Sequence, residues 1–110
     1  MVILAKRKRG MSLEAFRDYY ETRHAPLAQS MSTWMRRYQR NYLRPMAPGV
    51  EAPFDVLTEV WFDSQEGFRR NREELAAQPD KVAAIAADEE NLFDRSTITF
   101  FTAEEADSEL

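Results

Sequence analysis

Residues 34–64 read WMRRYQRNYLRPMAPGVEAPFDVLTEVWFDS, and the organisation of the chain follows from them. Residues 34–43 and residues 55–62 are rich in aromatic and β-branched side chains, which predicts two strands. Residues 45–53 hold three prolines and a glycine, which predicts the loop between the strands. Because no helix separates them, the two strands are expected to pair in antiparallel fashion.

Alternate residues of a strand point to opposite faces of its sheet. In the first strand, one face is expected to carry Trp34, Arg36, Tyr38, Arg40 and Tyr42, and the other Met35, Arg37, Gln39, Asn41 and Leu43. In the second strand, one face is expected to carry Val56, Thr58, Val60 and Phe62, and the other Leu57, Glu59 and Trp61. A register slip of one residue would exchange these faces.

A strand and a helix are predicted before this pair. Residues 2–5 have strand character, which continues into the basic run at residues 6–9. Ser12 is a suitable N-cap for a helix over residues 13–23. Pro26 is expected to prevent its continuation, because proline lacks the backbone N–H that a helix interior needs.

A helical region and a final strand are predicted after the pair. Asp63 or Ser64 can cap the helical region, and Pro79 is expected to interrupt it. Residues 97–101 form a dense strand signal. The resulting order, βαββαβ, is typical of the ferredoxin-like α+β fold, a four-stranded antiparallel sheet with helices on one face.

The length of 110 residues suits one domain, expected over residues 1–103, with an acidic tail at residues 104–110. Apolar and aromatic residues occur on both predicted faces of the sheet. Because helices cover only one face, the other is expected to be covered by a second copy of the chain, giving a homodimer.

Composition excludes several classes of site and partner. The chain has no cysteine, which excludes disulfides, zinc–thiolate sites and iron–sulfur clusters, and it has one histidine. No metal and no cofactor is therefore expected. The net charge of −4 argues against nucleic acid as a partner. No leader segment or membrane-spanning run is recognisable, so neither a membrane partner nor any location but the cytoplasm is expected.

His24 is the natural proton carrier, because only histidine has an ordinary pKa close to neutrality. Helical spacing places it on one stripe with Leu13, Phe16 and Tyr20, so it is expected to point towards the core. The alternative is a structural histidine that binds a backbone carbonyl group.

Other candidates lie on the second and third predicted strands. Tyr38 and Tyr42 share a face and can bind a phenol or carbonyl oxygen, or they can serve only in packing. Glu59 lies between apolar neighbours and needs a partner, for which Arg36 or Arg40 is available; alternatively Glu59 faces solvent. The acidic run at residues 88–90 is expected to be a solvated helix face, in which Asp88 can cap a helix or brace a neighbour.

Six blocks of this sequence resemble, in order, the EthD family of dimeric α/β-barrel proteins, and they span nearly the whole chain. The opening blocks match that family's basic strand, small loop, F-x-D-Y-W/Y helix and H-A-P-L segment; they are Lys8-Arg9-Gly10-Met11-Ser12, Phe16-Arg17-Asp18-Tyr19-Tyr20 and His24-Ala25-Pro26-Leu27. The later blocks are Arg37-Tyr38-Gln39-Arg40-Asn41, Glu59-Val60-Trp61-Phe62-Asp63-Ser64 and residues 88–94.

The resemblance implies a ferredoxin-like homodimer without fixing a reaction. The wider superfamily includes lactone isomerases, polyketide cyclases, cofactor-free monooxygenases and haem-handling proteins. In members similar to methylmuconolactone methylisomerase, a histidine at the position of His24 and a tyrosine near Tyr38 are associated with the site. The cysteines of that enzyme have no counterpart here, and neither has a histidine that some relatives carry near Tyr42.

Two main functions remain open. The first is a small cofactor-independent enzyme for cyclisation, isomerisation or dehydration of an aromatic, polyketide-like or lactone substrate. In it, His24 moves a proton and Tyr38 polarises an oxygen, in a pocket lined by Phe16, Tyr20, Tyr38, Tyr42 and Trp61, with Arg40 and Glu59 as further binding residues. The second is a ligand-binding or accessory protein that uses the same pocket; a cofactor-free monooxygenase is a further alternative.

Overall fold

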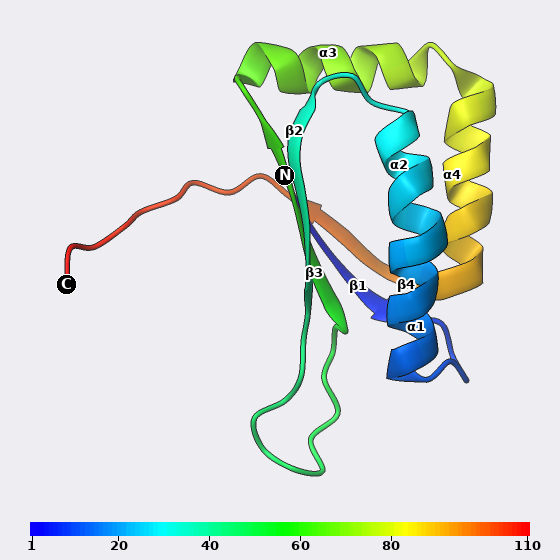
Figure 1. Cartoon of the computed structure of the whole chain (residues 1–110), viewed down its shortest axis with the longest axis vertical. Helices are drawn as coiled ribbons and strands as arrows, with labels where there is room; N and C mark the ends of the chain where they lie inside the picture. The colour runs from blue at the N-terminus through cyan, green and yellow to red at the C-terminus, as the bar shows by residue number, and fades with distance from the viewer.

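The structure, a computed structural model, describes residues 1–110 and contains one four-stranded sheet with helices on one of its faces (Figure 1). Its elements are β1 (Val2–Arg7), α1 (Leu13–Tyr19), the π-helical turn η1 (Tyr20–His24), α2 (Ala25–Ser30), β2 (Met35–Tyr42), β3 (Val56–Phe62), α3 (Gln65–Ala76), α4 (Pro79–Leu92) and β4 (Phe93–Phe101).

The sheet has the strand order β2-β3-β1-β4, and all neighbouring strands are antiparallel. α1, α2 and α4 stand against one face of the sheet, and α3 crosses one end (Figure 1). The opposite face carries no helix, and we call it the outer face. The predicted α+β, ferredoxin-like fold is confirmed, including the two consecutive strands β2 and β3 and the break between α3 and α4.

The first helical region differs from the prediction, because it continues through Pro26 to Ser30. The turn η1 makes this possible. In it the backbone N–H of Ala25 reaches the carbonyl of Tyr20, five residues back, instead of the usual four. Pro26 then occupies the first turn of α2, where its missing N–H costs little. The wider turn keeps both Tyr20 and His24 buried.

Two strand irregularities also depart from the prediction. β4 begins at Phe93, four residues earlier than expected, and its register against β1 shifts between Leu4 and Lys6. In β2 the register shifts between Met35 and Arg37. The extra residue of this bulge turns Met35 to the helix-covered face, although simple alternation predicts that it shares a face with Arg37.

The core lies between the sheet and the first helical region. The rings of Phe16, Tyr20 and Phe93 meet edge to face, with centroids 5.5–6.1 Å apart. Leu92 and Ala5 complete the contact between α4 and β1 and are fully buried. Such packing fixes the position of the helices relative to the sheet, and hence the position of the side chains that η1 presents.

The basic run at residues 6–9 is engaged partly in ion pairs within the chain. Arg7 donates its backbone N–H and a guanidinium N–H to the buried carboxylate of Asp55, at 2.8 and 2.9 Å. Lys6 binds Glu51 at 3.2 Å. These contacts tie β1 to the segment that precedes β3.

β4 ends at Phe101, and residues 102–110 are exposed and have no regular secondary structure. They run away from the sheet on the side of its outer face (Figure 1). None of the helices has both the length and the apolar character needed to cross a membrane.

Candidate functional site

A cavity of about 240 Å³ lies between the sheet and the helices. Twelve of the sixteen residues that line it are hydrophobic. Its polar lining residues are His24, Ser32, Asn71 and Glu89, and the phenols of Tyr20 and Tyr38 border it as well. The volume lies below the roughly 300 Å³ at which pockets for drug-sized ligands begin, so the cavity suits a small, largely apolar molecule.

His24 reaches this cavity from η1, and one of its ring nitrogens is held in place. Its Nδ1 lies 2.7 Å from Oδ2 of Asp88 on α4. The other oxygen of Asp88 accepts a hydrogen bond of 2.6 Å from the Tyr19 hydroxyl. Nε2 has no hydrogen-bonding partner in the structure, and it is not sealed from solvent. Nε2 is therefore the nitrogen that a ligand in the cavity can meet.

The charge on Asp88 sets the tautomer of His24. Burial opposes ionisation of Asp88, but the hydrogen bonds from Tyr19 and His24 outweigh it and hold the pKa of the carboxyl below its usual value. An ionised carboxylate only accepts hydrogen bonds, so Nδ1 carries the proton. Nε2 of the neutral imidazole is then an acceptor, the form that a general base needs.

Tyr38 and Tyr20 form a short chain of hydroxyl groups at the sheet. The Tyr38 hydroxyl donates to that of Tyr20 over 3.4 Å, and Tyr20 shares a hydrogen bond of 2.8 Å with the Thr58 hydroxyl. Burial raises the pKa of both phenols, so both stay protonated at neutral pH. The first of these bonds is long for an O–H···O contact, so the proton of Tyr38 is available to an oxygen atom of a ligand.

Three further candidates lie beside the cavity without lining it. Phe16 is 1% exposed and belongs to the core. Arg40 makes two hydrogen bonds, of 2.8 and 2.9 Å, to the carboxylate of Glu21. Tyr42 donates to the same carboxylate, and its ring packs edge to face on Phe16. These residues join η1 to β2 and so support the cavity wall.

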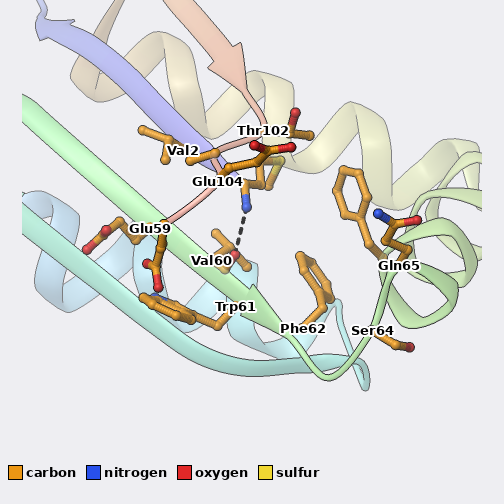
Figure 2. Close-up of a pocket in the computed structure, with 13 residues that line it drawn as sticks. Val2, Glu59, Val60, Trp61, Phe62, Ser64, Gln65, Thr102 and Glu104 are labelled. Atoms are coloured by element: carbon orange, nitrogen blue, oxygen red, sulfur yellow. Dashed lines mark hydrogen bonds between the residues drawn. The ribbon is translucent and has the colours of Figure 1, made fainter. Parts of the chain in front are cut away.

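Glu59 and Trp61 lie on the outer face of the sheet, away from His24. Figure 2 shows them together on β3, near Val2 of β1 and Glu104 of the tail. They line an open hollow of about 710 Å³ beside the N-terminal amine, which donates to the carbonyl of Val60. Glu59 is paired there with Asn41, over 3.4 Å, and not with an arginine.

The expected pocket is therefore divided between the two faces. The structure brings His24, Tyr20 and Tyr38 together around one cavity, and it places Trp61 and Glu59 across the sheet from them. The reason is the alternation of side chains along β3, where Thr58 and Val60 face the helices.

Asp88, Glu89 and Met35 belong to the site, although the sequence did not predict them as site residues. Asp88 was expected on a solvated helix face, with bracing of a neighbour as the alternative, and it is His24 that it braces. Glu89 was assigned to the same solvated face, and Met35 to the opposite face of the sheet; both line the cavity. Helical spacing within α4 offered a weak signal, since Glu89 lies four residues after Ile85, which also lines the cavity. No group of three or more histidine and acidic side chains is arranged to hold a metal ion.

Comparisons with known proteins agree with this fold. A family model described as the EthD domain matches residues 8–96. The crystal structure of an EthD-family protein from Bacillus halodurans C-125 superposes with a TM-score of 0.66, and the match covers 96% of this chain and 95% of that one at 22% identity. Curated protein sequences give no match.

Proposed function

Because the chain belongs to the EthD family, we propose that it is a small cofactor-independent enzyme that moves a proton on an aromatic, polyketide-like or lactone substrate. Family membership itself specifies no reaction. The observation that carries the proposal is His24, whose Nδ1 is bound to Asp88 while its Nε2 is free beside an apolar cavity.

The arrangement suits removal of a proton from a carbon next to a carbonyl group. Nε2 of His24 accepts the proton, and Asp88 stabilises the imidazolium that forms. The Tyr38 hydroxyl donates to the carbonyl oxygen, on which negative charge develops. A ligand that fills the cavity displaces water and leaves mostly apolar side chains around these groups, which strengthens both interactions.

The enolate that forms is the common intermediate of the cyclisations, isomerisations and dehydrations considered for this chain. His24 and Tyr38 keep the roles expected from the sequence, and Tyr20 takes part through its hydrogen bond with Tyr38. Arg40, Tyr42 and Phe16 hold the surrounding elements in place. Glu59 and Trp61 belong to a different surface and take no part in this chemistry within one chain.

Hydrogen–deuterium exchange of two small carbonyl compounds tests the proposal. Benzylacetone, an aromatic ketone, and dihydrocoumarin, an aromatic lactone, carry exchangeable protons next to the carbonyl group. The wild-type protein is expected to accelerate their exchange in D₂O by about 10²-fold or more over buffer. His24→Gln should abolish the acceleration while the probes still shift the NMR signals of the cavity residues.

The opposite result favours a binding protein. The cavity is lined mostly by hydrophobic side chains, which by themselves suit simple retention of an apolar ligand. If the probes bind at the cavity and exchange no faster than in buffer, or if His24→Gln exchanges them as fast as wild type, the proton-transfer proposal is overturned.

We further propose that two copies of the chain pair through the outer face. Residues paired across neighbouring strands point to the same face of the sheet, so the register identifies the residues that share the outer face with Glu59 and Trp61. The apolar residues among them come from β1, β3 and β4 and are Val2, Leu4, Leu57, Trp61 and Phe101. Phe101 is 48% exposed in the single chain, and the indole N–H of Trp61 is buried without a partner. A second copy would cover the apolar surface.

A further inference from the structure

A second carboxyl group lies in the His24 cavity, and the function proposed above does not use it. Glu89 lines the cavity from α4 and is partly buried. Its carboxyl group takes part in no hydrogen bond or ion pair within the chain, although both oxygens of its neighbour Asp88 have partners. A carboxyl group in an apolar wall without a partner is costly to keep unless a ligand uses it.

α4 brings these two carboxyl groups to the imidazole in different ways. Consecutive residues of an α-helix point about 100° apart. Asp88 therefore turns towards Nδ1 and Tyr19, while Glu89 turns into the cavity to which Nε2 opens. A ligand in the cavity can therefore meet both a base, His24, and a separate carboxyl group, that of Glu89.

We propose that Glu89 is the general acid of this site and that the substrate is a small β-hydroxy carbonyl compound with an apolar ring, which loses water. The inference rests on the proposed role of His24 as the base. A base alone suffices to form an enolate, whereas expulsion of a hydroxyl group from the adjacent carbon needs a proton donor. Glu89 supplies that donor in a cavity that holds no other carboxyl group.

The step balances without a co-reactant. The C–H bond next to the carbonyl breaks, and its proton goes to Nε2 of His24. The electron pair forms the C=C bond, the adjacent C–O bond breaks, and the leaving hydroxyl group takes the proton of Glu89 and departs as water. The proton on Nε2 then returns to the Glu89 carboxylate, through water, so both groups regain their starting states.

The surroundings of Glu89 favour the protonated form that this step needs. Burial raises the pKa of its carboxyl above the ordinary value. The nearby charges partly offset one another, because His24 of η1 and Arg95 of β4 favour ionisation while Asp88 disfavours it. The phenols of Tyr20 and Tyr38, which face the same cavity, stay neutral. Two groups of opposite role in one cavity are the usual arrangement for acid–base pairs.

Two probes with the same carbon skeleton separate the acid from the base. The aldol of acetone and benzaldehyde is a β-hydroxy ketone, and its dehydration to benzalacetone is followed by ultraviolet absorbance. Benzylacetone lacks the hydroxyl group, so its α-proton exchange in D₂O requires only His24. Both reactions are measured for the wild type, for Glu89→Gln and for Glu90→Gln, a control on the exposed side of α4.

In Glu89→Gln we expect dehydration to fall by about 10²- to 10⁴-fold. Benzylacetone exchange needs no acid, so it should fall far less and stay above the rate in buffer, which also shows that the variant is folded. Glu90→Gln should behave as wild type in both assays. In the wild type, dehydration should decline as the pH rises through the pKa of Glu89, because the acid must be protonated, and this limb of the profile should vanish in Glu89→Gln.

If Glu89→Gln loses both reactions to the same extent, Glu89 serves the cavity as a whole and its role as the acid is overturned. If wild type exchanges benzylacetone but does not dehydrate the ketol, or if Glu89→Gln dehydrates it at the wild-type rate, the role of Glu89 is overturned and that of His24 stands. If wild type does not accelerate exchange, the proposed function fails, and the acid role of Glu89 fails with it.

Discussion

At the scale of single residues, Asp88 determines what His24 can do. Its carboxylate fixes the proton on Nδ1 and stabilises positive charge on the ring. Asp88→Asn keeps the size of the side chain but removes the charge, and an amide can present either an oxygen or an N–H group to Nδ1. We expect benzylacetone exchange to fall by about 10²-fold.

The mechanism of that loss is visible in the ¹⁵N NMR spectrum of the imidazole. In the wild type, Nδ1 should carry the proton of the neutral ring. In Asp88→Asn, the signals should indicate a mixture of tautomers, and Glu90→Gln should leave them unchanged. An Asp88→Asn variant with the wild-type tautomer and exchange rate would show that Asp88 is not a positioning residue.

The same carboxyl group links stability to pH. The pKa of Asp88 is lower in the folded chain than its ordinary value of about 3.9. Its contribution to stability is therefore complete above pH 5 and disappears as the pH falls through the folded pKa. Urea unfolding at pH 5 should show Asp88→Asn less stable than wild type by about 1–3 kcal/mol. The difference should shrink steadily as the pH is lowered below the ordinary pKa of an aspartic acid; a difference independent of pH would contradict this origin.

His24 could be identified from the sequence, and Asp88 could be identified only as a possible brace, for a physical reason. The chain has one histidine, so its chemical type alone singled it out. The partner of that histidine lies 64 residues away on α4. Eighteen other acidic residues precede or follow it in the sequence, and the tertiary contact that distinguishes Asp88 leaves no periodic pattern.

At the scale of elements, local pattern predicted the strands and helices well because most of them have unambiguous boundaries. Ser12 and Ser64 cap α1 and α3 as expected, accepting from Ala15 and Gly67 at 3.0 and 3.1 Å. The exceptions are irregular hydrogen-bonding patterns. The π-helical turn before Pro26 and the bulge beside Arg36 each insert one residue, and such an insertion is stabilised by packing against the rest of the fold.

Substitution of two glycines by alanine should change the stability of the protein in opposite directions. Gly67 lies in the first turn of α3, and a Cβ added there would meet Ser64 and Trp34 at ordinary van der Waals distances of 3.6 and 3.7 Å. Gly67→Ala should therefore stabilise the protein by about 0.4–1 kcal/mol, because it restricts the unfolded chain. Thermal unfolding measures the change.

Gly10 provides the matched comparison. It has open space around it but a φ of +80°, which strains any residue with a Cβ. Gly10→Ala should destabilise the protein by about 1 kcal/mol. A destabilising effect of Gly67→Ala would mean that the new contacts with Ser64 and Trp34 cost more than the restriction of the unfolded chain gains.

At the scale of the whole molecule, the two faces of the sheet have separate tasks. The helix-covered face holds the His24 cavity, and the outer face carries the apolar strip proposed to pair with a second copy. Pairing through the outer face leaves the cavity walls within one chain. The proton chemistry and the association of the chains should therefore respond to different substitutions.

Leu57→Arg tests this separation. Leu57 lies opposite Leu4 and Asn41 in the middle of the outer face, so an arginine there would place an unpaired charge in the interface, at a cost of several kcal/mol. Light scattering should give the wild type the mass of two 12.9 kDa chains and the variant the mass of one. Val82→Arg, at an apolar residue of α4 that is 42% exposed, is the control and should remain a dimer.

The activity of the monomeric variant then decides whether the two faces are independent. Since His24, Asp88 and Tyr38 all belong to one chain on the far side of the sheet, Leu57→Arg should still exchange the α-protons of benzylacetone at the wild-type rate. A wild-type protein with the mass of one chain would contradict the pairing. A monomeric variant that is folded but inactive would instead show that the cavity needs the second copy, either for a group that the copy contributes or for the rigidity of the sheet that forms the cavity floor.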